Sequence, residues 1–208
     1  MSAAEPRPRL TSLPNLLGIS RIVATPVVMI LLLAPFPGAG LLAFVIFVVA
    51  AATDLLDGRI ARARGEVSPL GVFMDLTADK VLVAGVLVAM VEVGLLPTWI
   101  VATLLVRELV VQGVRQVAAS ADVVIAARWL GKGKTFATNL GIAILLLSFD
   151  AATDGPLART GLGPLLQIAG AWTMVLATIM SVASGWDYIK GALPLLMGRS
   201  AAGTDRPT

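Results

Sequence analysis

The segment ATDLLDGRIARARGEVSPLGVFMDLTADK, from Ala52 to Lys80, joins the end of one long apolar run to the start of the next. It carries two pairs of aspartates, Asp54 with Asp57 and Asp75 with Asp79. Residues three or four positions apart share a face of an α-helix, so each run predicts a helix with two carboxylates near one end. The linker of about seventeen residues turns near residues 65–69, which predicts antiparallel neighbouring helices whose acidic ends meet.

The composition of the whole chain indicates that these helices lie in a membrane. Of the 208 residues, 57% are hydrophobic and 14% are charged, and the mean hydropathy is +0.90. This balance is too apolar for a water-soluble globule. The pattern predicts an all-α integral membrane protein with six spans, each near the ~20 residues that cross a bilayer. We expect the spans at residues 16–34, 41–56, 71–93, 98–119, 135–149 and 162–188, in one membrane domain (13–198) between polar ends at 1–12 and 199–208.

Basic residues outside the expected spans fall almost entirely on one side of the membrane. When the spans alternate from the N-terminus, eleven of these residues lie on one face and Arg159 alone lies on the other. Because Lys and Arg concentrate on the cytoplasmic side, both termini and the aspartate-rich ends are expected there. The net charge of +3 is then a sign of orientation rather than of nucleic-acid binding. Within the spans, Arg21 is expected to snorkel towards the interface, and the mid-span Trp172 to take part in helix packing.

The residue inventory restricts the chemistry. The chain has neither Cys nor His, which excludes disulfides, thiolate nucleophiles, imidazole bases and metals ligated by either residue. Four carboxylates at the edge of the hydrocarbon need positive charge beside them, because desolvation and mutual repulsion disfavour their ionised forms. Lys or Arg could supply that charge, but an all-oxygen donor set suits hard cations, above all Mg²⁺ or Mn²⁺. Two such ions would clamp a phosphate and stabilise the attacking and leaving oxygens of a displacement.

Other interpretations of the acidic cluster remain open at this point. A single aspartate at a membrane end is often solvated or neutralised by a nearby Arg. A cation channel or carrier would also use intramembrane acids, although near the midplane of broken helices rather than at one rim. The glycines favour a ligand site, since Gly58 follows Asp57 and Gly71 lies one turn before Asp75, where a missing side chain admits a ligand. Arg62 can meet a phosphate with its planar guanidinium.

The spacing of these residues resembles the signature of the CDP-alcohol phosphotransferase family of membrane enzymes. It matches at every fixed position of Asp54-x2-Asp57-Gly58-x2-Ala61-Arg62-x8-Gly71-x3-Asp75-x3-Asp79. The resemblance implies a six-helix fold and the transfer of a phosphatidyl group from CDP-diacylglycerol to an alcohol, with release of CMP. It further implies two divalent cations, Mg²⁺ or Mn²⁺, bound by the four aspartates, with Asp79 also the general base. The residues implied to bind the CDP-lipid are Asp54, Asp57, Gly58, Ala61, Arg62, Ser68 and Gly71.

Three further segments are similar to those of the bacterial phosphatidylglycerophosphate synthases in that family, whose acceptor is sn-glycerol 3-phosphate. They are residues 13–26, 97–115 and 131–135. A phosphorylated acceptor needs cations, for which the candidates are Arg107, Arg115, Lys132 and Lys134. Each of these has the alternative of anchoring the cytoplasmic face, and Arg107 has the further alternative of pairing with Glu108. Within the family, the alternative functions are cardiolipin synthase and phosphatidylinositol phosphate synthase. The resemblance also implies a homodimer in the bacterial cytoplasmic (inner) membrane.

Overall fold

The computed structural model describes residues 13–64, 69–121 and 129–197. Within the helices, side chains at 13–15, 54–64, 69–72, 74–76, 129–130, 132 and 194–196 are outside that description. The described ranges form α-helices and one short 3₁₀ helix, without a β-strand. The elements are α1 (Leu13–Leu33), α2 (Ala39–Arg64), α3 (Pro69–Glu92), α4 (Thr98–Ser120), α5 (Trp129–Ala152), η1 (Ala158–Thr160) and α6 (Gly163–Leu196).

Each expected span coincides with one α-helix, so the all-α fold is confirmed over the described residues. Several helices extend past their apolar runs: α2 continues to Arg64, α5 begins at Trp129, and α6 continues to Leu196. Three described stretches, residues 16–33, 133–152 and 163–193, are long and apolar enough to cross a membrane, and α2 holds a shorter apolar stretch, Ala39–Thr53. Crossing of the bilayer by all six helices stays a prediction.

Glycine and proline set the turn between α3 and α4. Gly94 has a φ of +74°, in the left-handed region that glycine adopts without steric cost. Pro97 precedes the first residue of α4 with φ −73° and ψ 141°, an extended conformation typical of the residue before a helix. The chain therefore reverses within five residues, between Glu92 and Thr98.

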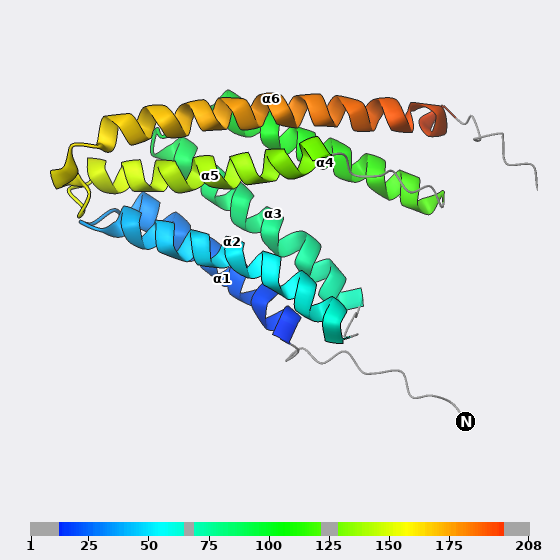
Figure 1. Cartoon of the computed structure of the whole chain (residues 1–208), viewed down its shortest axis with the longest axis horizontal. Helices are drawn as coiled ribbons and strands as arrows, with labels where there is room; N and C mark the ends of the chain where they lie inside the picture. Colours follow the sequence, from blue (N-terminus) through cyan, green and yellow to red (C-terminus); the bar gives the residue numbers. More distant parts are fainter. Residues whose placement is uncertain (1–12, 65–68, 122–128, 198–208) are drawn as a thin grey trace, which may run out of the picture.

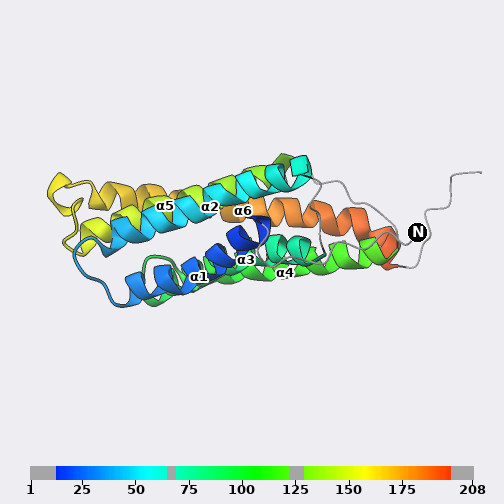
Figure 2. The ribbon, with the colours of Figure 1, turned by 90° about the horizontal axis from the view of Figure 1, so that it is seen from below.

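The helices lie side by side in a ring whose order is α2, α1, α3, α4, α6 and α5 (Figures 1 and 2). The antiparallel directions expected for α2 and α3 are visible in Figure 1. The expectation that these two helices are close neighbours is only partly right, because they touch lightly and each packs mainly elsewhere. Helix α1 packs extensively against both of them.

Small residues allow the closest helix contacts in this ring. A Cβ on Gly85 of α3 would lie 2.5 Å from the Cγ2 atom of Thr25 on α1. A Cβ on Gly170 of α6 would lie 2.7 Å from the Cγ atom of Leu145 on α5. Glycine at these positions lets the backbones approach, as is usual between membrane helices. The core itself is apolar and is centred on Leu32, Phe47, Leu82, Met90, Ile142 and Met174.

A buried carboxylate connects α2 with α5 at the end of the bundle opposite the start of α1 and the end of α6 (Figure 1). Asp150 of α5 is 0% exposed, and its Oδ1 accepts a hydrogen bond from the backbone N–H of Leu41 at 3.0 Å. Its Oδ2 accepts one from the backbone N–H of Leu157, also at 3.0 Å. The bond to Leu41 satisfies an N–H of the first turn of α2, where a helix favours negative charge. Asp150 thus fixes the start of α2 and the loop before η1.

Two expectations about polar and aromatic residues within the spans are wrong. Arg21 does not snorkel to the surface, because α1 packs against both α2 and α3 and leaves its side chain 0% exposed. Trp172 does not pack in the interior of this chain, because its side chain is 69% exposed on α6.

Candidate active site

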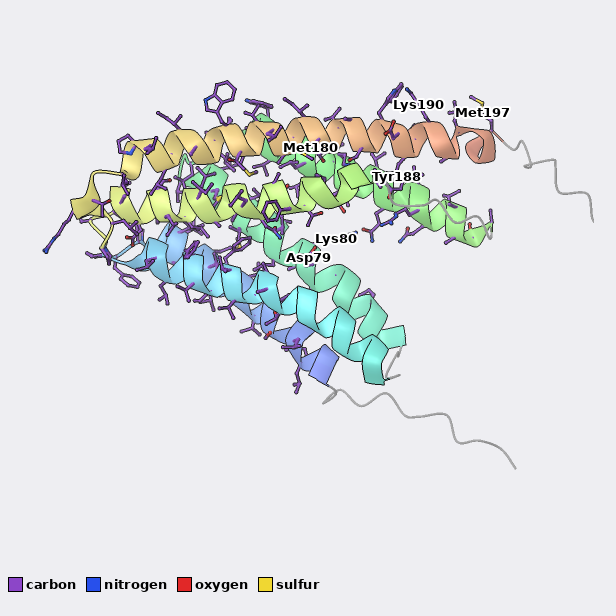
Figure 3. The ribbon with its side chains drawn as sticks, in the orientation of Figure 1. Asp79, Lys80, Met180, Tyr188, Lys190 and Met197 are labelled. Atoms are coloured by element: carbon purple, nitrogen blue, oxygen red, sulfur yellow. The ribbon has the colours of Figure 1, made fainter. Side chains whose placement is uncertain are left out.

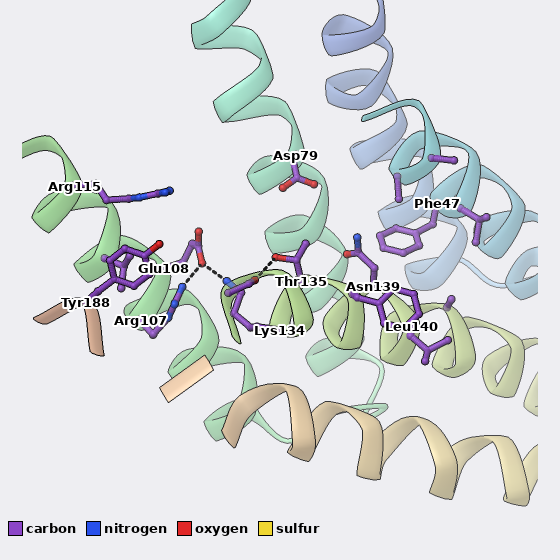
Figure 4. A pocket seen from close by; sticks show the side chains of 17 residues that line it. Phe47, Asp79, Arg107, Glu108, Arg115, Lys134, Thr135, Asn139, Leu140 and Tyr188 are labelled. Carbon is purple, nitrogen blue, oxygen red and sulfur yellow. Dashed lines mark hydrogen bonds and ion pairs between the residues drawn. The ribbon is translucent and has the colours of Figure 1, made fainter. Parts of the chain in front are cut away.

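A cavity of about 710 Å³ is lined by residues from α2, α3, α4, α5 and α6 (Figure 4). It lies in the half of the bundle where α2 ends and α5 begins, the end towards which α1, α2 and α3 diverge from α5 and α6 in Figure 1. Its described polar lining consists of Asp79, Arg107, Glu108, Arg115, Lys134, Thr135, Asn139 and Tyr188. A polar cavity between otherwise apolar helices is a candidate functional site.

Helical periodicity explains how α4 and α5 supply most of this polar wall. On α4, Arg107, Val111 and Arg115 are spaced four residues apart and so lie along one face. On α5, Gly131, Thr135, Asn139 and Ala143 follow the same spacing, with Lys134 beside them. The remaining polar wall comes from Asp79 on α3 and Tyr188 on α6.

Glu108 is at the centre of the charged cluster. Its Oε2 accepts a hydrogen bond from Lys134 Nζ at 2.5 Å and another from Arg107 Nη1 at 3.1 Å. Its Oε1 lies 3.7 Å from the Nζ atom of Lys80. Glu108 is the carboxylate partner of three cations that come from α3, α4 and α5. Figure 4 shows Asp79 directed into the space beside this cluster, and Figure 3 places Asp79 and Lys80 on the side of α3 that faces α5.

Arg107 donates hydrogen bonds to three groups of the protein. Its Nε donates to the backbone carbonyl of Ser181 at 2.9 Å, and its Nη2 donates to Ser184 Oγ at 2.7 Å, both on α6. With Nη1 on Glu108, each of its three nitrogens has a protein partner, and its side chain is only 10% exposed. The alternative given above, pairing of Arg107 with Glu108, is therefore present.

Arg115 is held differently. Its guanidinium lies over the ring of Tyr188, with Cζ 5.5 Å from the ring centroid. A cation over an aromatic face keeps its N–H groups directed outwards, where they can bind an anion. Figure 4 shows the Arg115 side chain directed into the same space as Asp79. Lys134 and Arg115 thus each have N–H donors left for a ligand at the cavity wall.

One wall of the cavity reaches the outside of the bundle. Val48 of α2 and Phe136 and Leu140 of α5 line the cavity, and their exposed fractions are 38%, 71% and 42%. These helices pack against each other, so the cavity has an apolar border along the outer surface at α2 and α5. An apolar border of this kind suits the hydrocarbon part of a lipid.

Most of the signature residues lie on helices whose side chains are outside the described part. The backbone places Asp54, Asp57, Gly58, Ala61 and Arg62 on α2, and Gly71 and Asp75 on α3. Asp75 and Asp79 are one turn apart on α3, and Asp54 and Asp57 are three positions apart on α2, so each pair shares a helix face. The side chain of Lys132 and the whole of Ser68 also lie outside the described residues.

The donor chemistry of these positions fits divalent cations. Four carboxylates without Cys or His form a hard oxygen set, which suits Mg²⁺ or Mn²⁺. Asp79, the member of the set whose side chain is described, lines the cavity. Among described side chains alone no group of three potential ligands occurs, and the other three aspartates are not among them.

Sequence reasoning missed several polar residues of the cavity. The sequence alone indicates Glu108 only as a partner of Arg107, and it indicates no role for Asn139 or Tyr188. The available signal was their polarity within apolar runs, since ionisable and amide groups inside membrane helices usually face an interior or a cavity. The Oδ1 atom of Asn139 is buried without a hydrogen-bond partner among the described residues.

Comparison with known proteins identifies the family. The model of the CDP-alcohol phosphatidyltransferase family matches residues 11–183. The chain belongs to this family.

Individual relatives of this CDP-alcohol phosphatidyltransferase cover most of its length. The chain is 35% identical over 189 residues to the CDP-diacylglycerol--glycerol-3-phosphate 3-phosphatidyltransferase of Bacillus subtilis, covering 85% of this chain and 93% of that protein. It is 36% identical over 193 residues to a probable phosphatidylglycerophosphate synthase of Mycobacterium tuberculosis, covering 90% and 84%. It is 34% identical over 188 residues to a CMP-forming cardiolipin synthase of Oryza sativa, covering 82% of this chain and 57% of that protein. Membership of an enzyme family favours catalysis over the cation channel or carrier considered above.

Proposed function

We propose that this protein transfers the phosphatidyl group of CDP-diacylglycerol to sn-glycerol 3-phosphate, giving phosphatidylglycerophosphate and CMP. The observation that carries the proposal is the combination, in one cavity, of Asp79, the cations Lys134 and Arg115, and an apolar border at the bundle surface. The carboxylate suits proton abstraction, the cations suit a phosphorylated acceptor, and the apolar border suits an acyl-bearing donor. The names of the Bacillus and Mycobacterium relatives support the same acceptor.

In this proposal the acceptor hydroxyl oxygen forms a bond to the phosphatidyl phosphorus while the bond from that phosphorus to the CMP oxygen breaks. The Asp79 carboxylate accepts the hydroxyl proton, and CMP leaves with the electron pair of the broken bond. Lys134 and Arg115 hold the phosphate of the acceptor, and Lys132 remains a candidate for the same task. Gly58, Ala61, Arg62, Ser68 and Gly71, together with Asp54 and Asp57, remain the proposed contacts of the CDP-lipid.

The residues proposed to hold two divalent cations are Asp54, Asp57, Asp75 and Asp79. When bound, such ions supply charge neutralisation for the pyrophosphate of the donor. The support for this assignment is the oxygen donor set and the shared helix faces described above, together with membership of the family.

The proposed setting is the bacterial cytoplasmic membrane, with both termini and the cavity on the cytoplasmic side. The one-sided distribution of basic residues supports this orientation. The start of α1 and the end of α6 lie at the end of the bundle nearer to the cavity, which agrees with it (Figure 1). The homodimer implied by the resemblance is part of the proposal and is tested by the mass of the protein in detergent.

CMP release tests the proposal. Purified protein is incubated with CDP-diacylglycerol, Mg²⁺ and one acceptor at a time. The acceptors are glycerol 3-phosphate, phosphatidylglycerol and inositol phosphate. We expect CMP with glycerol 3-phosphate. Release with phosphatidylglycerol alone would instead assign cardiolipin synthesis, which the rice relative makes the second candidate. Release with inositol phosphate alone would assign a phosphatidylinositol phosphate synthase.

A pair of matched variants tests the acceptor site. Lys134→Ala should raise the KM for glycerol 3-phosphate by about tenfold or more, while the KM for CDP-diacylglycerol changes little, because a phosphate loses a charged donor. Lys190→Ala is the control, since Lys190 lies 5.3 Å from the ring centroid of Trp186 and does not line the cavity. Equal increases in both KM values for Lys134→Ala would remove Lys134 from the acceptor site.

A further inference from the structure

The inference concerns how the phosphate-binding cation Lys134 is positioned, and it rests on the function proposed above. Lys134 carries a long flexible side chain, and a free lysine loses much rotamer freedom when it binds a ligand. In this structure the ammonium is already bound to Glu108 Oε2 at 2.5 Å, and the side chain is 14% exposed. An ammonium has three N–H donors, so this bond leaves donors for a phosphate oxygen.

Glu108 is itself fixed through Arg107. Arg107 reaches across to α6, where it binds the Ser181 carbonyl and Ser184 Oγ, and its third nitrogen binds Glu108. Gly185 makes room for this crossing, because a Cβ there would lie 3.0 Å from Arg107 Cγ and 3.1 Å from its Nε. These bonds fix the guanidinium of Arg107 between α4 and α6 and orient it towards Glu108.

The same carboxylate also controls repulsion between the cations. Lys134, Arg107 and Lys80 come from three helices and would repel one another without a shared anion. Glu108 is 34% exposed, so its charge is partly shielded from water and acts on its neighbours more strongly than a surface carboxylate would. With Glu108 in place, Lys134 is held at the cavity wall before the acceptor arrives.

We propose that Glu108 is a positioning residue for the phosphate of the acceptor, and that Arg107 is its anchor rather than a phosphate ligand. Hydrogen bonds connect α6 to the ammonium that binds the phosphate: Arg107 binds Ser184 and Glu108, and Glu108 binds Lys134. The ammonium is therefore held in a fixed position relative to α6. The ligand class is a phosphomonoester small enough to enter from water. Of the four cations expected to bind the acceptor phosphate, Lys134 and Arg115 bind it in this proposal, and Arg107 anchors Glu108. Lys132 is outside this division.

Glu108→Gln provides the main test, because the amide keeps the shape of the side chain and loses its charge. We expect the KM for glycerol 3-phosphate to rise about tenfold, the KM for CDP-diacylglycerol to change less than twofold, and kcat to change less than threefold. Glu108→Asp, which keeps the charge on a shorter side chain, should recover part of the loss. Glu92→Gln, an exposed position at the end of α3 outside the cavity, is the matched control and should behave as the unaltered protein.

A double variant separates positioning from a general effect on the fold. In the Lys134→Gln background, adding Glu108→Gln should leave the KM for glycerol 3-phosphate unchanged, because the residue being positioned is gone. If Glu108→Gln does not fold, Arg107→Lys offers a second route. It should raise the KM for glycerol 3-phosphate and leave the KM for CDP-diacylglycerol unchanged. A fall in the KM for glycerol 3-phosphate on Glu108→Gln, or equal rises in both KM values, would overturn the proposal.

Direct binding distinguishes failure of this inference from failure of the proposed function. Calorimetric titration of the unaltered protein and of Glu108→Gln with glycerol 3-phosphate, and separately with inorganic phosphate, requires no turnover. If no CMP is released but glycerol 3-phosphate binds about tenfold more weakly to Glu108→Gln, the proposed function fails and the positioning role stands. If CMP is released and both proteins bind glycerol 3-phosphate equally, the positioning role fails.

Discussion

Asp150→Asn replaces the buried carboxylate that connects α5 with the start of α2 and with the loop before η1. Two backbone N–H groups, of Leu41 and Leu157, donate to its two oxygens at 3.0 Å each. An amide offers one oxygen and one NH₂ group, so one of these N–H groups would face another donor. The surrounding backbone cannot move aside easily, because a Cβ on Gly40 or Gly155 would already lie within 2.4 Å of an Asp150 atom.

The expected loss follows from these contacts. A hydrogen bond to a charged group contributes about 1.5–3 kcal/mol, and a buried N–H left unsatisfied costs about 1–3 kcal/mol. Allowing for relaxation and for the weaker bond that an amide oxygen still accepts, we expect a destabilisation of about 3 kcal/mol. For a chain of this length, 1 kcal/mol shifts the unfolding midpoint by about 2–4 °C. The variant should therefore unfold at a temperature lower by about 6–12 °C.

The assay is thermal unfolding of the purified protein in detergent, followed by helical circular dichroism. Asp154→Asn is the control, because it makes the same chemical change four residues later at an exposed position. Asp154 has a φ of +55°, a conformation that asparagine tolerates well, so its midpoint should change little. Equal midpoints for the two variants would refute the role given to Asp150.

Three further outcomes follow from the site and the packing. Asp79→Asn should lower CMP release by at least 100-fold while CDP-diacylglycerol still binds, because the amide cannot accept the proton; a rate near that of the unaltered protein would exclude Asp79 as the base. Chelation with EDTA should stop CMP release, and Mg²⁺ or Mn²⁺ should restore it; full activity in the chelator would contradict the assignment of metal to the aspartates. Gly85→Ala should destabilise the fold by about 1–3 kcal/mol, because the new Cβ would meet Thr25. Gly113→Ala is the control: open space surrounds Gly113, so the change should be neutral or stabilising by up to ~1 kcal/mol. A higher melting temperature for Gly85→Ala than for Gly113→Ala would contradict the packing of α1 on α3.

The helices could be predicted from the sequence because their causes are local. Apolar runs and the Gly94 and Pro97 turn lie within a few residues of the elements that they determine. The ends of α2 and α6 were less predictable, since a helix can continue past the apolar run. In α2, the sequence RIARAR after Gly58 consists mainly of good helix formers, and the helix continues to Arg64.

The order of helices in the ring could not be predicted in the same way. Adjacency in sequence favoured α2 and α3 as close neighbours, but α1 packs against both. The contact of Gly85 with Thr25 joins positions sixty residues apart, and nothing local to either residue specifies the other. The burial of Arg21 has the same origin, because it depends on which helices cover α1.

Within the site, the sequence indicated cations that line the cavity but not the different contacts that each of them makes. Arg107 and Lys134 both line the cavity, as expected for residues near a phosphate. Their difference arises from Ser181 and Ser184, which lie more than seventy residues after Arg107 and reach it only because α4 packs on α6. A charge count treats the two residues as equivalent, whereas Arg107 is bonded to Ser181, Ser184 and Glu108, and Lys134 to Glu108.

The network around Glu108 also explains how so many charges can line a cavity between apolar helices. Lys134 is mostly buried, and an unpaired ammonium at such a place would be strongly disfavoured. Pairing with Glu108 offsets part of that cost before an anion binds, and the bond to Arg107 holds the carboxylate in place. An incoming phosphate can then use the remaining donors of Lys134 without first breaking the pair. The pairing that lowers the cost of burying Lys134 is therefore the same one that prepares the cavity for an anion.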